Sequence, residues 1–212
     1  MVDQFQTCRV YAEIPTIYPN NVGRSILYSA CQRIQRHISR SRRWRLVESL
    51  REFDVVMSQF GHMFAPRPRV VIAEMLRVLK PGGIIAFATW PPELLIGTSF
   101  TLVSTYMPPL PEGVSPPPQW GDVGIVRERL GSAAKEVVFD RGCMLFPALS
   151  VSNYRNQLEH TAGPMLKLVE SLSASDPARL AQFRREYEQL VARYFEDNVV
   201  RQDYLFTRAT KV

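Results

Sequence analysis

The sequence has few cysteines, few histidines and no long apolar run. Its three cysteines, Cys8, Cys31 and Cys143, are far apart and none has CxxC spacing. Such an odd, scattered set predicts reduced thiols in a cytoplasmic protein rather than a disulfide framework. The three histidines are equally scattered, so no metal site is predicted. We find neither a run of about eighteen apolar residues nor the apolar core of a signal peptide, so no transmembrane segment is expected.

Glycine and lysine are scarce in the first quarter of the chain. Residues 1–52 contain one glycine, Gly23, no lysine, nine arginines and four acids, which gives a charge of +5. Residues 53–212 contain 17 bases and 16 acids, which gives +1. This asymmetry predicts two regions, an atypical arginine-rich segment over 1–52 and an ordinary globular part over 53–212.

The arginine-rich segment has three interpretations. Apolar residues between Ile26 and Ile38 recur at helical spacing, which favours a solvated helix packed on the sheet. Clustered arginines also suit a nucleic-acid or anionic-membrane surface, although lysines, interleaved aromatics and a known binding module are missing. The third interpretation is decay or a shifted reading frame, since peptides such as RSRRWR are typical of GC-rich DNA read out of frame.

Residues 53–92 follow a strand–helix–strand pattern. Phe53 to Met57 is a short, β-branched apolar run, as expected for a strand covered on both faces. From Val70 to Lys80 the apolar residues recur at helical spacing, and the sequence Lys-Pro-Gly-Gly ends that helix. Ile84 to Trp90 is a second apolar strand. The pattern predicts a right-handed βαβ unit with parallel strands.

The motifs in this unit resemble a known family. The runs FDVVMSQFGHMF, RVLKPGG and IIAFATW resemble strand 4, helix D and strand 5 of class I methyltransferases that use S-adenosylmethionine. The similarity is greatest to the small-molecule branch called type 11, or ubiquinone/menaquinone-biosynthesis-like, and extends less specifically to Val212. It implies an α/β fold, a partial Rossmann-like sheet that retains strands 4 to 7, with a helical insertion before the last strand. A βαβ unit of another doubly wound fold is the alternative.

The sequence departs from this family before Phe53. Members carry three earlier strands, of which the first ends in a glycine-rich GxGxG loop that approaches the cofactor closely. Only 52 residues precede Phe53 here, and they contain no such loop. Neither Asp3 nor Glu13 follows a convincing strand, so the acid that binds the ribose in the family is also missing. The resemblance therefore implies S-adenosylmethionine as cofactor, while the missing motif makes its binding doubtful.

Further elements are predicted after Pro92. Asp122 is a candidate N-cap of a short helix, and Gly142 is a candidate bulge in a strand. Residues 150–199 read as helices, and Ser-Asp-Pro at 175–177 is a strong helix start. By resemblance this helical region is a lid over the substrate pocket. The full set of predicted elements is a helix over 94–106, a proline-rich arm over 107–118, a helix over 122–130, strands over 135–146 and 202–210, and the helical region between them.

The candidate site residues follow the first strand. Ligands bind at the carboxyl ends of strands in such sheets. Ser58, Gln59 and Phe60 occupy that end, and the resemblance implies that they lie beside the methionine part of the cofactor. His62 is the candidate catalytic base if a substrate proton must leave. The structural alternative is a loop histidine that hydrogen-bonds the backbone.

Three functions are compatible with these observations. The first is a methyltransferase family member acting on a small molecule, with doubtful activity. The second is an inactive remnant or interaction protein on the same scaffold, and the third a basic nucleic-acid-binding protein, for which there is less support. Without strands 1 to 3, the strand that begins at Phe53 would have an open apolar edge. We expect residues 22–50 to cover it as a helix, or a homodimer or aggregate to form there.

Overall fold

The computed structural model describes residues 53–212, and its centre is a mixed sheet in the order β1-β2-β5-β3. All four strands predicted from the sequence are present in this sheet, so the predicted α/β fold class is confirmed. A two-residue strand, β4, pairs with β5 outside this path. The strand bounds are β1 Phe53–Gln59, β2 Leu79–Thr89, β3 Ala134–Pro147, β4 Phe195–Glu196 and β5 Val199–Lys211.

The predicted βαβ unit is confirmed. β1 and β2 are parallel neighbours, and Val56 lies opposite Ile85 in their register. β5 lies between β2 and β3 and runs antiparallel to both. β1, β2 and β3 therefore share one direction, and the last strand of the chain runs against them.

The helices connect these strands and cover the sheet. Helix α2 connects the two parallel strands, starts with a proline in its first turn and buries Ile72 and Leu76, as its apolar spacing predicts. Two predicted N-caps are confirmed, because the carboxylates of Asp122 and Asp176 accept the backbone N–H groups of Ile125 and Arg179. The helix bounds are α2 Pro68–Val78, α3 Leu95–Tyr106, α4 Val123–Leu130, α5 Val151–Thr161, α6 Gly163–Ser175 and α7 Pro177–Ala192, with 3-10 turns η1 His62–Phe64, η2 Pro117–Gly121 and η3 Gly131–Ala133.

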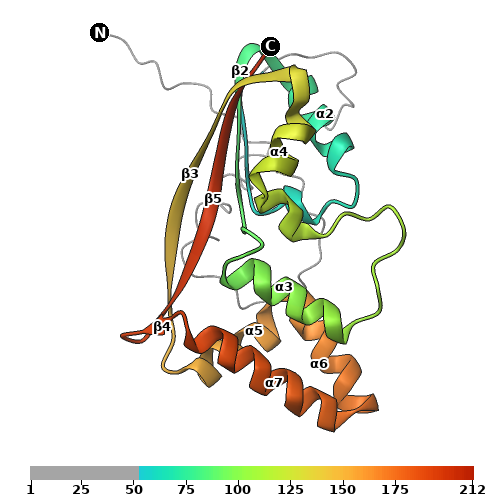
Figure 1. The fold of residues 1–212 in the computed structure, drawn as a ribbon, viewed down its shortest axis with the longest axis vertical. Coiled ribbons are helices and arrows are strands. Elements are labelled where there is room, and N and C mark those ends of the chain that lie inside the picture. Colours follow the sequence, from blue (N-terminus) through green and yellow to red (C-terminus); the bar gives the residue numbers. More distant parts are fainter. Residues whose placement is uncertain (1–52) are drawn as a thin grey trace, which may run out of the picture.

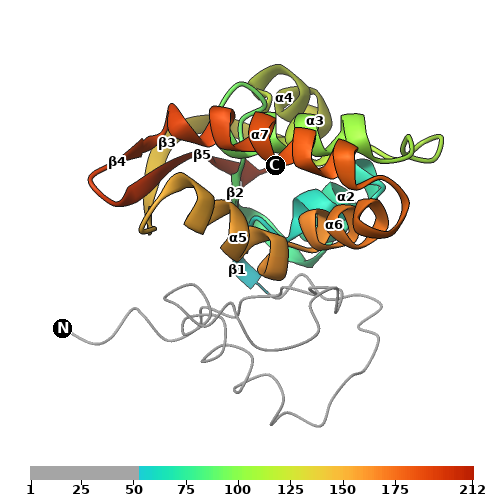
Figure 2. The same ribbon diagram turned by 90° about the horizontal axis from the view of Figure 1, so that it is seen from below.

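The described residues form two hydrophobic clusters at opposite ends of the long β3–β5 ribbon. Figure 1 shows α2 and α4 beside the upper part of the sheet, and α3, α5, α6 and α7 at the lower end. The first cluster includes Phe87 of β2 and Trp120 of η2, both fully buried. The second includes Phe183 and Tyr187 of α7, so the predicted apolar stripe of this helix is core. Figure 2 shows the molecule from the end where α5, α6 and α7 lie.

Several boundaries differ from the sequence prediction, most clearly around the Lys-Pro-Gly-Gly sequence and at the end of the helical region. α2 ends at Val78 and β2 begins at Leu79, so the Lys-Pro-Gly-Gly sequence lies inside the strand as an irregular start, with Gly82 at φ +74°. The helical region predicted over 150–199 ends at Ala192, because residues 195–199 turn back to start β5. From Leu79 onward the chain is extended, and Leu79 is fully buried in the first hydrophobic cluster.

The bulge predicted at Gly142 is wrong. Gly142 stays in register opposite Tyr204, and the register shift of β3 lies between Lys135 and Val138, where Glu136 has φ +53°. Glycine is needed at 142 for another reason. A Cβ atom there would lie 2.2 Å from the ring of Tyr204, so the aromatic side chain occupies the space of the missing one.

Two further predictions fall partly outside the described residues. Within residues 53–212, β1 pairs with β2 alone, so one of its edges has no neighbour in this part of the chain. The predicted cover of that edge by residues 22–50 and the three interpretations of residues 1–52 lie outside the described residues. Among the helices of 53–212, none is both long and apolar enough to span a bilayer.

Candidate functional site at the carboxyl edge of the parallel strands

The carboxyl ends of β1 and β2 lie side by side at one edge of the sheet. Gln59, the last residue of β1, is opposite Ala88, one residue before the end of β2. Phe60 follows with φ +59°, a left-handed conformation that is rare for a bulky residue, and its N–H donates to the Ala88 carbonyl at 3.0 Å. The backbone therefore turns sharply away from the sheet at the position where parallel sheets bind ligands.

The ring of Phe60 is held between aromatic neighbours. It stacks on Trp90, the residue after β2, with ring centroids 3.9 Å apart and an angle of 3° between the planes. Tyr204 of β5 meets the same ring edge-on at 5.9 Å. Offset-stacked and edge-to-face pairs stabilise by about 0.5–1.5 kcal/mol each beyond area burial. These contacts offset the backbone strain at Phe60 and fix the loop that follows β1.

Ser58 and His62 form a hydrogen-bonded pair on the inner side of this loop. The Ser58 Oγ lies 3.0 Å from the His62 Nδ1, and it accepts the His62 backbone N–H at 3.3 Å. His62 is only 8% exposed, and its ring packs against Phe87 and Trp120. Burial, followed by the nearby positive charge of Arg129, lowers the pKa of His62 to about 3.

The four predicted site residues thus lie at the end of β1 and in the turn that follows it, but they face different surroundings. Ser58 and His62 face the core, Gln59 is exposed, and Phe60 is half-buried. The His62 ring is neutral at ordinary pH and its Nε2 is buried, so a role as general base requires His62 or the residues that cover it to move. The ring of His62 bonds the Ser58 hydroxyl rather than a backbone group, the partner that the structural alternative assumed.

A small pocket lies beyond the same edge. Arg141 of β3 pairs with Leu205 of β5, which in turn pairs with Thr89 at the end of β2. Arg141 therefore lies level with the carboxyl end of β2. The pocket has a volume of about 290 Å³ and lies between the segment before α3 and the β3–β5 ribbon. It is lined by Leu94, Arg141, Gly142, Cys143, Arg201 and Asp203.

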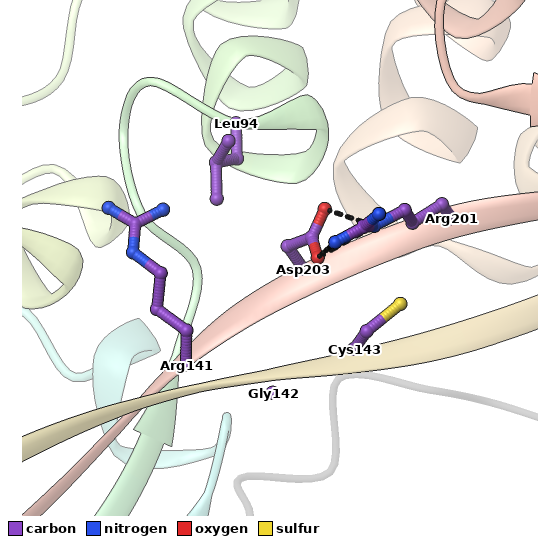
Figure 3. Close-up of a pocket in the computed structure, with 6 residues that line it drawn as sticks. All are labelled: Leu94, Arg141, Gly142, Cys143, Arg201 and Asp203. Carbon is purple, nitrogen blue, oxygen red and sulfur yellow. Dashed lines mark hydrogen bonds and ion pairs between the residues drawn. The ribbon is translucent and has the colours of Figure 1, made fainter.

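Charged groups stand on both sides of this pocket. Figure 3 shows Arg141 on one side and the Arg201–Asp203 pair on the other. Arg141 donates to Glu93 at 2.8 Å, and the Arg201 Nε donates to both Asp203 oxygens at 2.9 and 3.0 Å. Cys143 is an exposed free thiol at its base. The sequence analysis missed these residues, and the one signal for them is charge at alternate positions 201 and 203, which places both side chains on one face of a strand.

No group of three or more metal-binding side chains occurs within residues 53–212. The site in this part of the chain therefore consists of the aromatic-supported loop at 58–60, the buried Ser58–His62 pair behind it and the charged pocket beside it.

Comparison with known families identifies this segment. Residues 46–87, which include β1, α2 and most of β2, match the family model described as a methyltransferase domain. The predicted resemblance to the methyltransferase family is confirmed for this segment, which is the βαβ unit whose carboxyl edge forms the candidate site.

Curated relatives share a longer region. An uncharacterised protein of Mycobacterium bovis and one of Mycobacterium tuberculosis are each 29% identical over 161 residues, which is 76% of this chain and 58% of theirs. The chain thus spans little more than half the length of these relatives. Among solved structures, the YcgJ protein of Bacillus subtilis aligns with 79% of this chain and 67% of its own, at 12% identity and a TM-score of 0.43. Phosphoethanolamine N-methyltransferase 2 of Haemonchus contortus aligns with 76% of this chain and 34% of its own, at 16% identity and a TM-score of 0.36.

Proposed function

We propose that this chain belongs to an S-adenosylmethionine-dependent methyltransferase acting on a small molecule, and that residues 53–212 provide its substrate side. The observation that carries the proposal is the parallel β1–β2 pair, whose shared carboxyl edge presents Gln59 and Phe60, with the pocket at Arg141 at the same level of the neighbouring β3–β5 ribbon. A pocket of about 290 Å³ is at the lower end of the volumes of small-molecule sites, so it fits a small acceptor group. Methyl transfer needs the acceptor and the sulfonium carbon in line, so much of the rate comes from such positioning.

The residues at this edge fit one end of the cofactor only. Gln59 is exposed at the strand end, and Phe60 presents a half-buried ring, so both can contact the methionine part of S-adenosylmethionine. The Ser58 hydroxyl already bonds His62, which leaves its backbone as the contact. The sequence has no glycine-rich loop to approach the nucleoside, so we expect weak binding by this chain alone. When bound, the cofactor would supply the methyl group.

The remaining residues have assigned roles in this proposal. His62 acts as general base only if it or the residues that cover it move, and otherwise holds the Ser58–Phe60 loop in place. Helices α5 to α7 form the lid over the substrate side, as the resemblance implies. A cytoplasmic location and the absence of a nucleic-acid partner are part of the same proposal.

NMR titration of the full chain with S-adenosylhomocysteine tests this assignment. We expect shifts at the amides of Gln59, Phe60 and Trp90 in fast exchange, with millimolar affinity. Gln59→Ala should weaken these shifts, whereas Gln182→Ala, which removes an exposed glutamine on α7, should leave them unchanged. Absence of shifts at this edge, or shifts confined to another surface, would refute the assignment.

One observation favours a second function, an interaction protein on the same scaffold. Within residues 53–212, the outer edge of β1 has no paired strand, and Met57 on this strand is 38% exposed. An open apolar edge is a site for pairing with another chain. If the chain forms a homodimer through β1, light scattering should give twice the monomer mass. Met57→Lys should reduce this to the monomer mass. A monomer at all concentrations would exclude the homodimer.

A further inference from the structure

Four buried polar side-chain atoms within residues 53–212 have no hydrogen-bond partner: His62 Nε2, Trp120 Nε1, Arg129 Nη1 and Thr207 Oγ1. A buried donor or acceptor without a partner costs about 1–3 kcal/mol. Native structures therefore pair such groups with protein, ordered water or a bound ion.

These four atoms belong to side chains that gather in one region. The rings of His62 and Trp120 have centroids 4.5 Å apart, and the guanidinium carbon of Arg129 lies 4.8 Å from the Trp120 ring centroid. Thr207 is the cross-strand neighbour of Phe87. The Phe87 ring itself lies 4.8 Å from His62 and 5.7 Å from Trp120. All four unpaired atoms thus come from the space between the sheet and the segments η1, η2 and α4.

Two of the four atoms can only donate, and a third donates in one tautomer of its ring. A hydroxyl oxygen can accept two hydrogen bonds, so the Ser58 Oγ is compatible with a proton on either ring nitrogen of His62. When its own proton is directed to Nδ1, the ring proton is on Nε2. An indole nitrogen only donates, and so does a guanidinium. The region therefore has an excess of N–H groups and needs an acceptor.

The region also carries a positive charge that forms no ion pair within residues 53–212, although the charges of Glu128 and Asp122 act on Arg129 from nearby. Arg129 Nη2 donates to the Ser115 Oγ at 2.8 Å and to the Gln119 Oε1 at 2.9 Å, and both acceptors are uncharged. Among the ion pairs of the described residues, none includes Arg129. When His62 carries its proton on Nε2, a water molecule, which accepts two hydrogen bonds, would leave one of the three donors unpaired.

We propose that the side chains of His62, Trp120 and Arg129 form a binding site for one small inorganic anion of the size of chloride or bromide. The anion accepts the three N–H groups and balances the guanidinium charge. It joins η1, η2 and α4 directly behind the loop that carries Ser58 and Phe60, so it stabilises the position of that loop.

Bromide is the probe for this site. In crystals of the full chain grown in sodium bromide, we expect an anomalous peak in contact with Trp120 Nε1 and His62 Nε2. In solution, chloride or bromide at 150 mM should raise the melting temperature by about 3 °C relative to gluconate at equal ionic strength.

Arg129→Gln should abolish the dependence of melting on halide. Arg127→Gln is the matched control, because Arg127 lies on the same helix over another aromatic ring, Phe139, and has no buried unpaired nitrogen. This control should keep the full halide shift. If Arg129→Gln does not fold, the presence or absence of the bromide peak in the unaltered chain tests the proposal. A water at that position with no anomalous peak, or equal melting in the three salts, would overturn the proposal.

Discussion

Phe60 lies flat against Trp90, with ring centroids 3.9 Å apart, and the two residues follow the two parallel strands of the sheet. This stack joins the ends of β1 and β2 and holds Phe60 in a left-handed backbone conformation, at φ +59°. The candidate site therefore depends on an aromatic contact between two strand ends, and its consequences can be measured separately.

Phe60→Ala should destabilise the protein by about 2–3 kcal/mol, because it removes a stacked, half-buried ring and leaves the strained backbone unsupported. Urea unfolding followed by tryptophan fluorescence measures this loss. Leu149→Ala is the control, since that leucine is 82% exposed and its removal should change stability by less than about 0.5 kcal/mol. Equal effects of the two substitutions would contradict the role of the stack.

Acid should destabilise the fold through His62. Its folded pKa of about 3 lies below the unfolded value of 6.5, so the unfolded state binds a proton first as the pH falls. The stability from this group is complete above pH 6.5 and is lost between 6.5 and 3, by about 2 kcal/mol at pH 5. Urea unfolding at pH 8 and pH 5 measures it, and His62→Gln should remove this part of the difference. An unchanged pH dependence in the variant would place the acid sensitivity elsewhere.

A buried carboxylate joins α5 to α7. Glu159 is 3% exposed and accepts Arg184 at 2.9 and 2.7 Å and Arg155 at 2.5 Å. Burial acts to raise the pKa of Glu159, but the hydrogen bonds and charges of Arg184 and Arg155 outweigh it and lower the pKa. Glu159→Gln should destabilise by about 3 kcal/mol, since two partly buried guanidiniums lose their shared partner.

Glu188→Gln is the control for this network. Glu188 contacts Arg155 at 2.7 Å with a side chain that is 35% exposed, so its loss should cost about 1 kcal/mol or less. Thermal melting of both variants gives the comparison, and a milder effect of Glu159→Gln would show that the network is not structural.

Gly142→Ala should destabilise by about 2 kcal/mol, because its Cβ would lie 2.2 Å from the Tyr204 ring and force that ring off Phe60. Adding Tyr204→Val should recover part of the loss, which a double-mutant cycle of urea unfolding measures. Gly124→Ala on helix α4 is the comparison, because its Cβ would lie 3.2 Å from the Asp122 Oδ1, a milder contact, so its loss should stay below about 1 kcal/mol. Strict additivity of the two substitutions would contradict the close contact.

The sequence predicted the elements whose causes are local. The parallel pair β1 and β2 follows from two apolar runs around an amphipathic helix, and the start of α7 follows from Asp176 and the proline after it. The buried face of α7 follows from helical spacing. These features depend on residues that are close in the sequence, so the spacing of apolar and capping residues was sufficient to predict them.

Features that depend on distant residues could not be predicted. Gly142 resembled a bulge because nothing in the sequence indicates that Tyr204 lies over it. His62 resembled an accessible base because the side chain that covers it, Trp120, is 58 residues away in the chain. The charged pocket brings together three segments that are dozens of residues apart in the sequence. The only sign of it in the sequence is the pair of charged residues at alternate positions 201 and 203 of one strand.

The most direct test of the central proposal is calorimetric titration of the full 212-residue chain with S-adenosylhomocysteine. If residues 53–212 provide the substrate side without a loop that holds the nucleoside, the dissociation constant will be in the millimolar range. Micromolar binding with one site per chain would contradict this, and would mean that the chain holds the nucleoside by residues other than a glycine-rich loop.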